Sequence, residues 1–284
     1  MGHRHAAPVA PSQQAPCQTP HWTDPQWLLW LTKRSCNGWR LFPNAEGHQV
    51  SRRQPIFNAP TSVLALIAGL ALVHASRHFL TDSQDDLLIW TLAFIPARYG
   101  PSESDLPGAP LASVTSFVTH MLLHGDATHL VVNCAWLLIF GSAVARRVGT
   151  LRFFLFSLVC GAGGALGFLF FNPGLRAPVI GASGAVSGLM GGVMRFIFSM
   201  LDYSRARLSW EQAWAAPRMS LRQMARDRRV AIAIGLWVML NFLASLGFGG
   251  LAPPGVIAWE AHLGGFSAGL LTFGLFDRPV QERR

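Results

Sequence analysis

The sequence predicts an all-α membrane protein in which six transmembrane helices form one bundle. Of its 284 residues, 51% are hydrophobic and only 13% are charged. Soluble domains carry roughly 25% charged residues, so the surface of this chain is expected to meet lipid rather than water. Long apolar stretches alternate along the chain with segments rich in arginine. The low charged fraction, the long apolar stretches and the alternating arginine-rich segments therefore indicate the same class of fold.

A helix that crosses the hydrocarbon core of a bilayer needs roughly 20 mostly apolar residues. Six stretches meet or nearly meet this length: Thr61–Ser76, Ala127–Ala145, Phe153–Phe171, Val179–Met194, Val230–Phe248 and Val256–Phe276. The fourth ends early at Arg195, so we expect either a short helix or an Arg195 side chain that reaches toward the membrane surface. The patch Leu87–Ala97 is too short to span and predicts an interfacial segment or part of a long loop.

The chain divides into three parts by composition. Residues 1–55 are rich in Pro, Gln and His and predict a poorly ordered N-terminal tail. Residues 56–278 form the predicted membrane domain, and residues 279–284 form a C-terminal tail. The formal net charge is +9, and the arginines gather in alternate loops, which by the positive-inside rule places both termini in the cytoplasm. We expect the basic residues to face lipid headgroups rather than nucleic acid. Without a presequence pattern, a bacterial inner membrane is the expected location.

Four polar residues lie inside the predicted membrane segments, where such groups are costly and by default functional. They are His129 and Asn133 in the second segment, Ser183 in the fourth and His262 in the sixth. These three segments all enter the membrane from the outer side in the predicted topology. Each polar group lies only a few residues inside its helix, so all are expected at similar depth in the outer half of the bilayer.

Small residues at helical spacing predict which helices touch. Gly184, Gly188 and Gly192 repeat every four residues in the fourth segment, and Gly265 and Gly269 do so in the sixth. Such stripes let two helix backbones approach closely in lipid. We therefore expect the fourth and sixth helices to pack together, which would bring Ser183 toward His262.

The chemistry that suits this set is acyl transfer. A serine hydroxyl needs a base, for which an imidazole is suited, and attack on a carbonyl produces an oxyanion that needs donors. His129 and Asn133, four residues apart, share a helix face and can donate. Glu260 is expected on a different face from His262, so a Ser–His dyad is simpler than a triad. Asn241 in the fifth segment is expected to cross-link helices.

These residues resemble the motifs of the rhomboid family. Gly181-Ala182-Ser183-Gly184 resembles its GxSG motif, the Ala261–Gly265 run with Gly269 its AHxxGxxxG motif, and His129 with Asn133 its HxxxN element. His124 resembles a further histidine near the start of that helix. The resemblance covers roughly residues 56–278.

The family implies an intramembrane serine protease that cuts transmembrane substrates near their outer end, with Ser183 and His262 as the catalytic dyad. His129 and Asn133 would stabilise the oxyanion, and no metal or cofactor is implied. Leu87–Ala97 resembles the family's membrane-embedded loop, and Gly247–Gly255 resembles its flexible cap. Many members carry an aromatic residue four positions after the nucleophile, packed on the base. Here that position is Ser187.

Other functions remain to be weighed. A zinc protease would need HExxH and an aspartyl protease two membrane-embedded Asp residues, and neither pattern occurs in the sequence. A transporter would need polar residues at several depths, whereas here they gather in the outer half. A rhomboid-like binding protein without activity stays open as the main alternative. The substrate, the cleavage preference and the oligomeric state are left open by the sequence.

Overall fold

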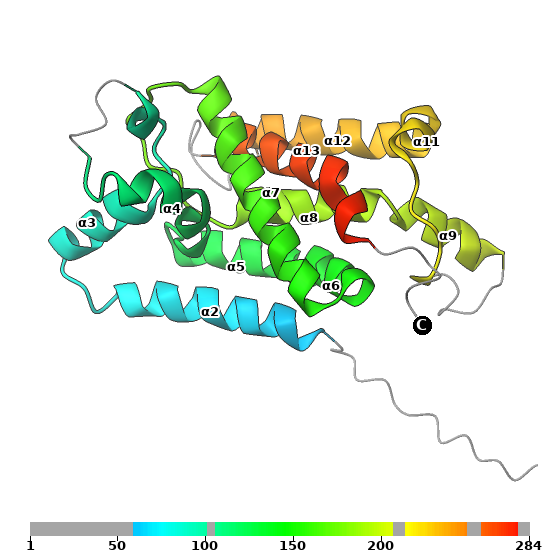
Figure 1. The fold of residues 1–284 in the computed structure, drawn as a ribbon, viewed down its shortest axis with the longest axis horizontal. Coiled ribbons are helices and arrows are strands. Elements are labelled where there is room, and N and C mark those ends of the chain that lie inside the picture. Colours follow the sequence, from blue (N-terminus) through cyan, green and yellow to red (C-terminus); the bar gives the residue numbers. More distant parts are fainter. Residues whose placement is uncertain (1–58, 101–105, 207–213, 249–256, 278–284) are drawn as a thin grey trace, which may run out of the picture. The chain divides into compact units, whose positions relative to one another are not determined.

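The protein is mainly helical in the region that its computed structural model describes, residues 59–100, 106–206, 214–248 and 257–277 (Figure 1). The prediction of an all-α fold is confirmed. Within these ranges the sole β-type contact is an isolated bridge between Phe94 and Val179. The predicted tails and most of the predicted cap, residues 249–256, lie outside the described residues.

The first half of the described chain consists mostly of short helices. They are α2 (Thr61–Arg77), α3 (Asp82–Leu92), the 3-10 turn η1 (Pro96–Tyr99), α4 (Leu111–Thr119), the 3-10 turn η3 (His120–Leu122), α5 (Ala127–Trp136), the π-helical segment η4 (Leu137–Gly141) and α6 (Ser142–Val148). The second half continues with α7 (Thr150–Phe171), α8 (Ser183–Met194), α9 (Ile197–Arg205), α11 (Leu221–Arg226), α12 (Arg228–Ser245) and α13 (Trp259–Phe276).

Each of the six predicted membrane segments contains a helix. Within the described ranges, four helical stretches are long and apolar enough to cross a membrane by themselves: Ala127–Val148, Thr150–Phe171, Ser183–Arg205 and Arg228–Ser245. At 1.5 Å per residue the two 22-residue stretches are about 33 Å long, which matches a hydrocarbon core of about 30 Å. The other two predicted segments correspond to α2, a shorter apolar helix of 17 residues, and α13, with 18.

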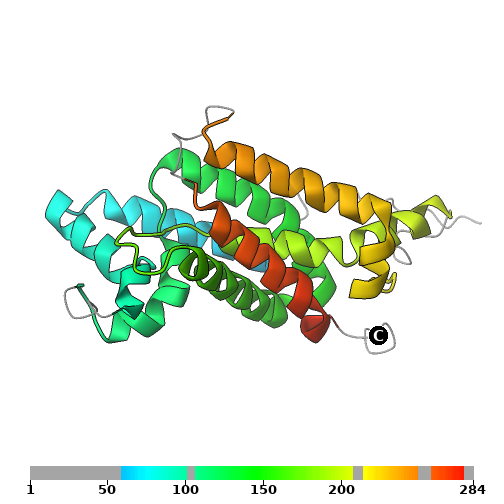
Figure 2. The same ribbon diagram turned by 90° about the horizontal axis from the view of Figure 1, so that it is seen from above.

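Helices α7, α8 and α13 pack together at the centre, and glycines line their contacts (Figure 2). A Cβ atom on Gly163 would come within 2.4 Å of Ala268 on α13, and one on Gly264 within 2.4 Å of the Gly163 carbonyl oxygen. Any side chain larger than hydrogen would force these helices apart. Because lipid offers no hydrophobic drive for helix association, such close backbone contact supplies much of the packing energy.

The fourth predicted helix begins later than expected. The segment before Ser183 is extended, because the backbone of Val179 exchanges two hydrogen bonds with Phe94, at 3.0 and 2.8 Å. Gly181 then adopts a φ of +117°, a conformation that a helix does not contain. Helix α8 therefore starts at Ser183 rather than at Val179.

Of the two alternatives for the end of the fourth segment, the short helix is confirmed, because α8 ends at Met194, whereas Arg195 does not reach outward. Its side chain is buried, and its guanidinium donates to the carbonyl oxygens of Met219 and Leu270, at 2.9 and 2.7 Å. Those carbonyls belong to the segment before α11 and to α13. Arg195 thus joins three parts of the chain at the end of α8 that lies away from Ser183.

A buried ion pair lies at the same end of the bundle. The guanidinium of Arg147, in the last turn of α6, donates to both carboxylate oxygens of Asp277, just after α13, at 3.0 and 3.1 Å. Both side chains are fully buried, and Arg147 also donates to the Ala216 carbonyl oxygen and lies over the Phe196 ring. This pair fixes the end of α13 against α6.

Candidate active site

Three of the predicted site residues lie at the beginnings of three helices that run in the same sense (Figure 1). His129 is the third residue of α5, Ser183 the first of α8 and His262 the fourth of α13. Side chains at the same ends of neighbouring parallel helices share one level of the bundle. This matches the sequence expectation that the polar groups lie at similar depth.

The segment that leads to Ser183 is held by three successive backbone bonds. The N–H groups of Val179, Gly181 and Ala182 donate to the Phe94 carbonyl (2.8 Å), the His120 carbonyl (2.9 Å) and Nε2 of His124 (3.5 Å). The sequence alone did not indicate these partners, apart from His124. The result is that the chain reaches α8 in a fixed conformation.

Ser183 is the first residue of α8, so its backbone N–H is among the helix's unpaired amide donors. The first four N–H groups of an α-helix have no partner within the helix, and the helix dipole adds partial positive charge there. Val186 is the first residue of α8 whose N–H is bonded in helical fashion, to the Ala182 carbonyl at 2.9 Å. Negative charge that develops beside Ser183 would meet donors that are already in place.

The predicted contact between the fourth and sixth helices is confirmed as a contact between α8 and α13. A Cβ atom on Gly265 would lie 2.0 Å from the Gly184 carbonyl oxygen, and one on Gly269 would lie 1.9 Å from the Gly188 carbonyl oxygen. The two helices therefore touch backbone to backbone. Gly184 follows Ser183 directly and Gly265 is three residues after His262, so this contact sets the distance between the two predicted catalytic residues.

The imidazole of His129 lies against the segment before Ser183. A Cβ atom on Gly181 would be 2.6 Å from Nε2 of His129, so only glycine fits there. The Gly125 N–H points to Nδ1 of the same ring, at 3.5 Å, which assigns the ring proton to Nε2. The Nε2–H group of His129 therefore faces Gly181, where it can act as a hydrogen-bond donor.

Asn133 is buried one helical turn after His129. Its amide nitrogen donates to the His129 carbonyl oxygen at 2.9 Å, a bond within α5 itself. One N–H of the amide remains for another acceptor, since the group has two. His124 is fully buried, and its carbonyl accepts from Arg77 at 2.6 Å. Burial lowers the pKa of His124 to about 4, so its imidazole is neutral at physiological pH.

His262 is oriented by a residue that was not expected to be part of the site. Its Nδ1 lies 2.8 Å from Oδ1 of Asn241 on α12. Among the residues that the structure describes, the Ser183 hydroxyl makes no hydrogen bond to His262. Glu260, as expected, faces elsewhere, with its carboxylate 3.4 Å from the Asn172 amide.

Comparison with known proteins decides the family. A family model described as the rhomboid domain matches residues 112–278, more than half of the chain. The chain belongs to the rhomboid family. Its apolar helices accord with this, and the protein is an integral membrane protein of rhomboid type.

Two curated relatives come from Arabidopsis thaliana. The chain is 35% identical over 159 residues to RHOMBOID-like protein 4, across 55% of this chain and 33% of the relative. It is 38% identical over 92 residues to the mitochondrial RHOMBOID-like protein 6, across 32% of this chain and 29% of the relative. The chain thus spans about a third of the length of the curated relatives it matches.

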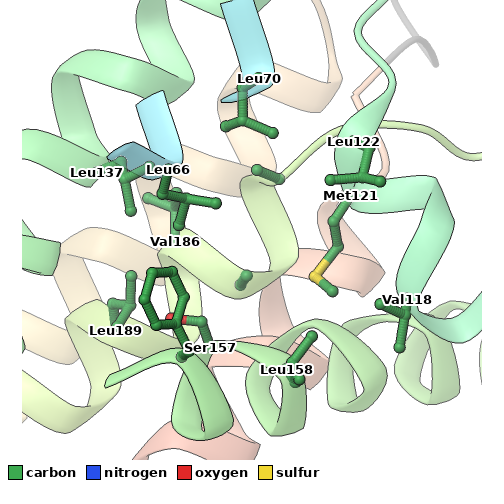
Figure 3. A pocket seen from close by; sticks show the side chains of 13 residues that line it. Leu66, Leu70, Val118, Met121, Leu122, Leu137, Ser157, Leu158, Val186 and Leu189 are labelled. Atoms are coloured by element: carbon green, nitrogen blue, oxygen red, sulfur yellow. The ribbon is translucent and has the colours of Figure 1, made fainter. Parts of the chain in front are cut away.

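An apolar cavity of about 150 Å³ lies on the far side of α8 from α13 (Figure 3). Ala185, Val186 and Leu189 line it from α8, whereas the glycines of that helix face α13. The Met121 side chain points into it from the segment before α5 (Figure 3). The cavity wall holds no titratable group, and the Ser157 hydroxyl there is bonded to the Phe153 carbonyl. Ala182, the residue directly before Ser183, also lines this cavity.

Sequence reasoning missed two features of the rhomboid site. Glycines of α7 also approach α13, and a Cβ atom on Gly167 would lie 2.7 Å from Cα of Gly264. The pair Gly163 and Gly167, spaced by four, was the available signal. The second feature is the contact of Asn241 with His262. Polarity alone marked Asn241 as a cross-link, but did not indicate its partner.

Proposed function

We propose that this rhomboid-family chain is an intramembrane serine endopeptidase that cleaves transmembrane helices near the outer face of the membrane. One observation carries the proposal. Gly184 and Gly265 hold α8 and α13 in backbone contact immediately beside Ser183 and His262. The substrate class follows from the family resemblance and from the position of the four polar residues near the helix beginnings.

The proposed reaction passes through an acyl-enzyme. Oγ of Ser183 attacks the scissile carbonyl carbon while Nε2 of His262 takes the hydroxyl proton. The imidazolium then gives this proton to the leaving amine, and the C–N bond breaks. A water molecule, deprotonated by His262, next attacks the acyl carbon, and the Ser183 ester bond breaks with return of the proton to Oγ. The peptide carboxyl group is released.

The oxyanion formed in each step is stabilised by hydrogen-bond donors that are in place beforehand. We assign this role to the backbone N–H of Ser183, to Nε2–H of His129 and to the Asn133 amide. The role of the Ser183 N–H is supported by its place at the start of α8, and the role of Nε2–H of His129 by the approach of its ring to Gly181. Removing one such donor costs about 100- to 1000-fold in kcat in other serine proteases.

The test is cleavage of a model transmembrane substrate by the full chain in detergent and in liposomes. Ser183→Ala and His262→Ala are expected to abolish cleavage while thermal unfolding stays close to that of the wild type. Ser187→Ala is the matched control, because it removes another buried hydroxyl one turn further along α8 and is expected to keep cleaving. Cleavage that survives Ser183→Ala would refute the serine mechanism.

The second candidate is a rhomboid-like protein that binds transmembrane helices without cutting them. The lack of a hydrogen bond between Ser183 and His262 among the described residues favours it, although catalytic hydrogen bonds are often long before substrate binds. One experiment distinguishes the protease from the binding protein. A fluorophosphonate probe that labels the wild type but not Ser183→Ala supports the protease, and a wild type that binds a substrate helix without labelling or cleavage supports the binder.

We further propose a bacterial inner membrane as the location, with the arginine-rich segments and both termini on the cytoplasmic side. The arginines of α11 and of the start of α12, which include Arg222, Arg226 and Arg228, lie exposed at the end of the bundle opposite to Ser183. Reporter fusions test this orientation. A periplasmic phosphatase fused after residue 277 is expected to be inactive, and an active fusion would reverse the topology.

A further inference from the structure

The orientation of His262 depends on a side chain from a neighbouring helix. Helix α12 runs antiparallel to α13 beside it in both views (Figures 1 and 2). Oδ1 of Asn241 on α12 lies 2.8 Å from Nδ1 of His262 on α13.

The hydrogen bonds of Asn241 define which way its amide points. Its Nδ2 donates to the Trp237 carbonyl oxygen at 2.9 Å. A carbonyl oxygen can only accept, so the amide nitrogen has to face Trp237 and the amide oxygen has to face His262. This orientation follows from the bonding pattern even though amide oxygen and nitrogen are similar in shape.

The same reasoning assigns the proton on His262. Because the Asn241 oxygen can only accept, Nδ1 of His262 has to carry the ring proton. Nε2 is then left with a free lone pair in the neutral ring. A general base needs such a lone pair, and the bond made by one ring nitrogen determines the state of the other.

The contact is supported on both sides by aromatic packing between the two helices. Trp237, one turn before Asn241, stacks on Phe266, one turn after His262, with ring centroids 4.3 Å apart and planes 21° apart. At the other side, Phe242 meets Trp259 edge to face, at 6.0 Å. These pairs keep α12 in register with α13, so that the Asn241 amide stays at the imidazole.

We propose that Asn241 is a positioning residue that keeps His262 as the Nδ1–H tautomer, with Nε2 free to accept the Ser183 proton. The inference rests on the proposed function, since it names the residue that orients the base of that reaction. Histidine oriented by asparagine is a known arrangement in proteases of unrelated fold that use a cysteine nucleophile. A plain cross-link between helices is the rival explanation.

The experiment compares three variants of the full chain in detergent. Asn241→Leu keeps a similar volume but removes the acceptor, and Asn241→Asp keeps an acceptor oxygen. Ser245→Ala is the matched control, because Ser245 lies one turn further on α12, is buried and donates its hydroxyl to the Phe242 carbonyl of its own helix. The measurements are kcat and KM on a model transmembrane substrate, and nitrogen NMR of histidine-labelled protein, with His262→Gln to assign the signals.

We expect Asn241→Leu to lower kcat about 10- to 100-fold and to change KM less than about threefold. The reason is that the variant disturbs the tautomer of the His262 base but leaves the contacts with the substrate in place. Asn241→Asp is expected to recover most of kcat, and Ser245→Ala to resemble the wild type. The His262 signals should show Nδ1 protonated in the wild type and a mixture of tautomers in Asn241→Leu.

Two results would overturn the inference. One is a wild type in which Nε2 of His262 carries the proton. The other is an Asn241→Leu variant with kcat and tautomer unchanged, which leaves Asn241 as a cross-link only. A wild type that shows the Nδ1–H tautomer but no cleavage would instead refute the proposed function, so the two failures are distinguishable.

Discussion

The contact between Gly265 and Gly184 offers the sharpest test of how α8 and α13 are held together beside the candidate site. In Gly265→Ala the new Cβ would lie 2.0 Å from the Gly184 carbonyl oxygen. Ordinary carbon–oxygen contacts begin near about 3.3 Å, so α8 and α13 must separate locally by about 1 Å. Overpacking of this kind costs about 1–3 kcal/mol of stability. A displacement of about 1 Å at reacting groups costs about 100-fold in rate.

The assay combines thermal unfolding by circular dichroism with cleavage of a model transmembrane substrate. We expect Gly265→Ala to unfold at a lower temperature and to lose far more activity than its folded fraction explains. Gly274→Ala on the same helix is the control, since its Cβ would meet Arg218 Nε at an ordinary 3.5 Å. Alanine has the higher helix propensity, so the control should be neutral or slightly stabilised. A Gly265→Ala protein with the unfolding temperature and the cleavage rate of the wild type would refute the reasoning.

Two further predictions concern charged pairs. Arg147→Met should lower the free energy of unfolding by about 3–5 kcal/mol, because the buried Asp277 carboxylate loses its two hydrogen bonds from Arg147 and keeps the longer contact with Arg218, at 3.6 Å. Adding Asp277→Leu should restore part of the loss, and equal stability of the single and double variants would contradict this. The Arg77 guanidinium holds the pKa of Asp85 below its usual 3.8. The stability that this ion pair adds is therefore complete at pH values above 3.8, and it is lost as the pH falls through the depressed pKa of Asp85. Melting temperatures measured down the pH scale should show this acid loss in the wild type and in Asp86→Asn, but not in Asp85→Asn.

The helical segments were predictable because membrane insertion imposes a simple rule on the chain. Each span needs an uninterrupted apolar run, and each of the six predicted runs lies on a helix. The start of α8 was misplaced because Val179 is as apolar as a helix residue. Its pairing with Phe94, 85 positions earlier in the chain, leaves no local mark in the sequence.

The polar residues of the candidate site were found for a related reason. Histidine, asparagine and serine are costly in lipid, so their presence in apolar runs points to function without knowledge of the fold. The glycine stripe likewise predicted that α8 meets α13. The catalytic roles of Ser183 and His262 remain predictions that the proposed experiments address.

What depended on tertiary structure was the partner of each polar group. Sequence spacing shows which residues share one helix face, but not which face of a second helix lies opposite. The pairing of Asn241 with His262 required the register of α12 against α13. The burial of Arg195 likewise required carbonyl groups brought from Met219 and Leu270.

The amino-acid sequence alone was thus enough to establish a helical membrane protein and to select its candidate site residues, because polar groups are costly in lipid. Tertiary structure decided where α8 begins, how closely Gly184 approaches Gly265, and which nitrogen of His262 is left free. Those properties depend on contacts between residues far apart in the chain, and such contacts are set by packing of the whole bundle rather than by any local pattern.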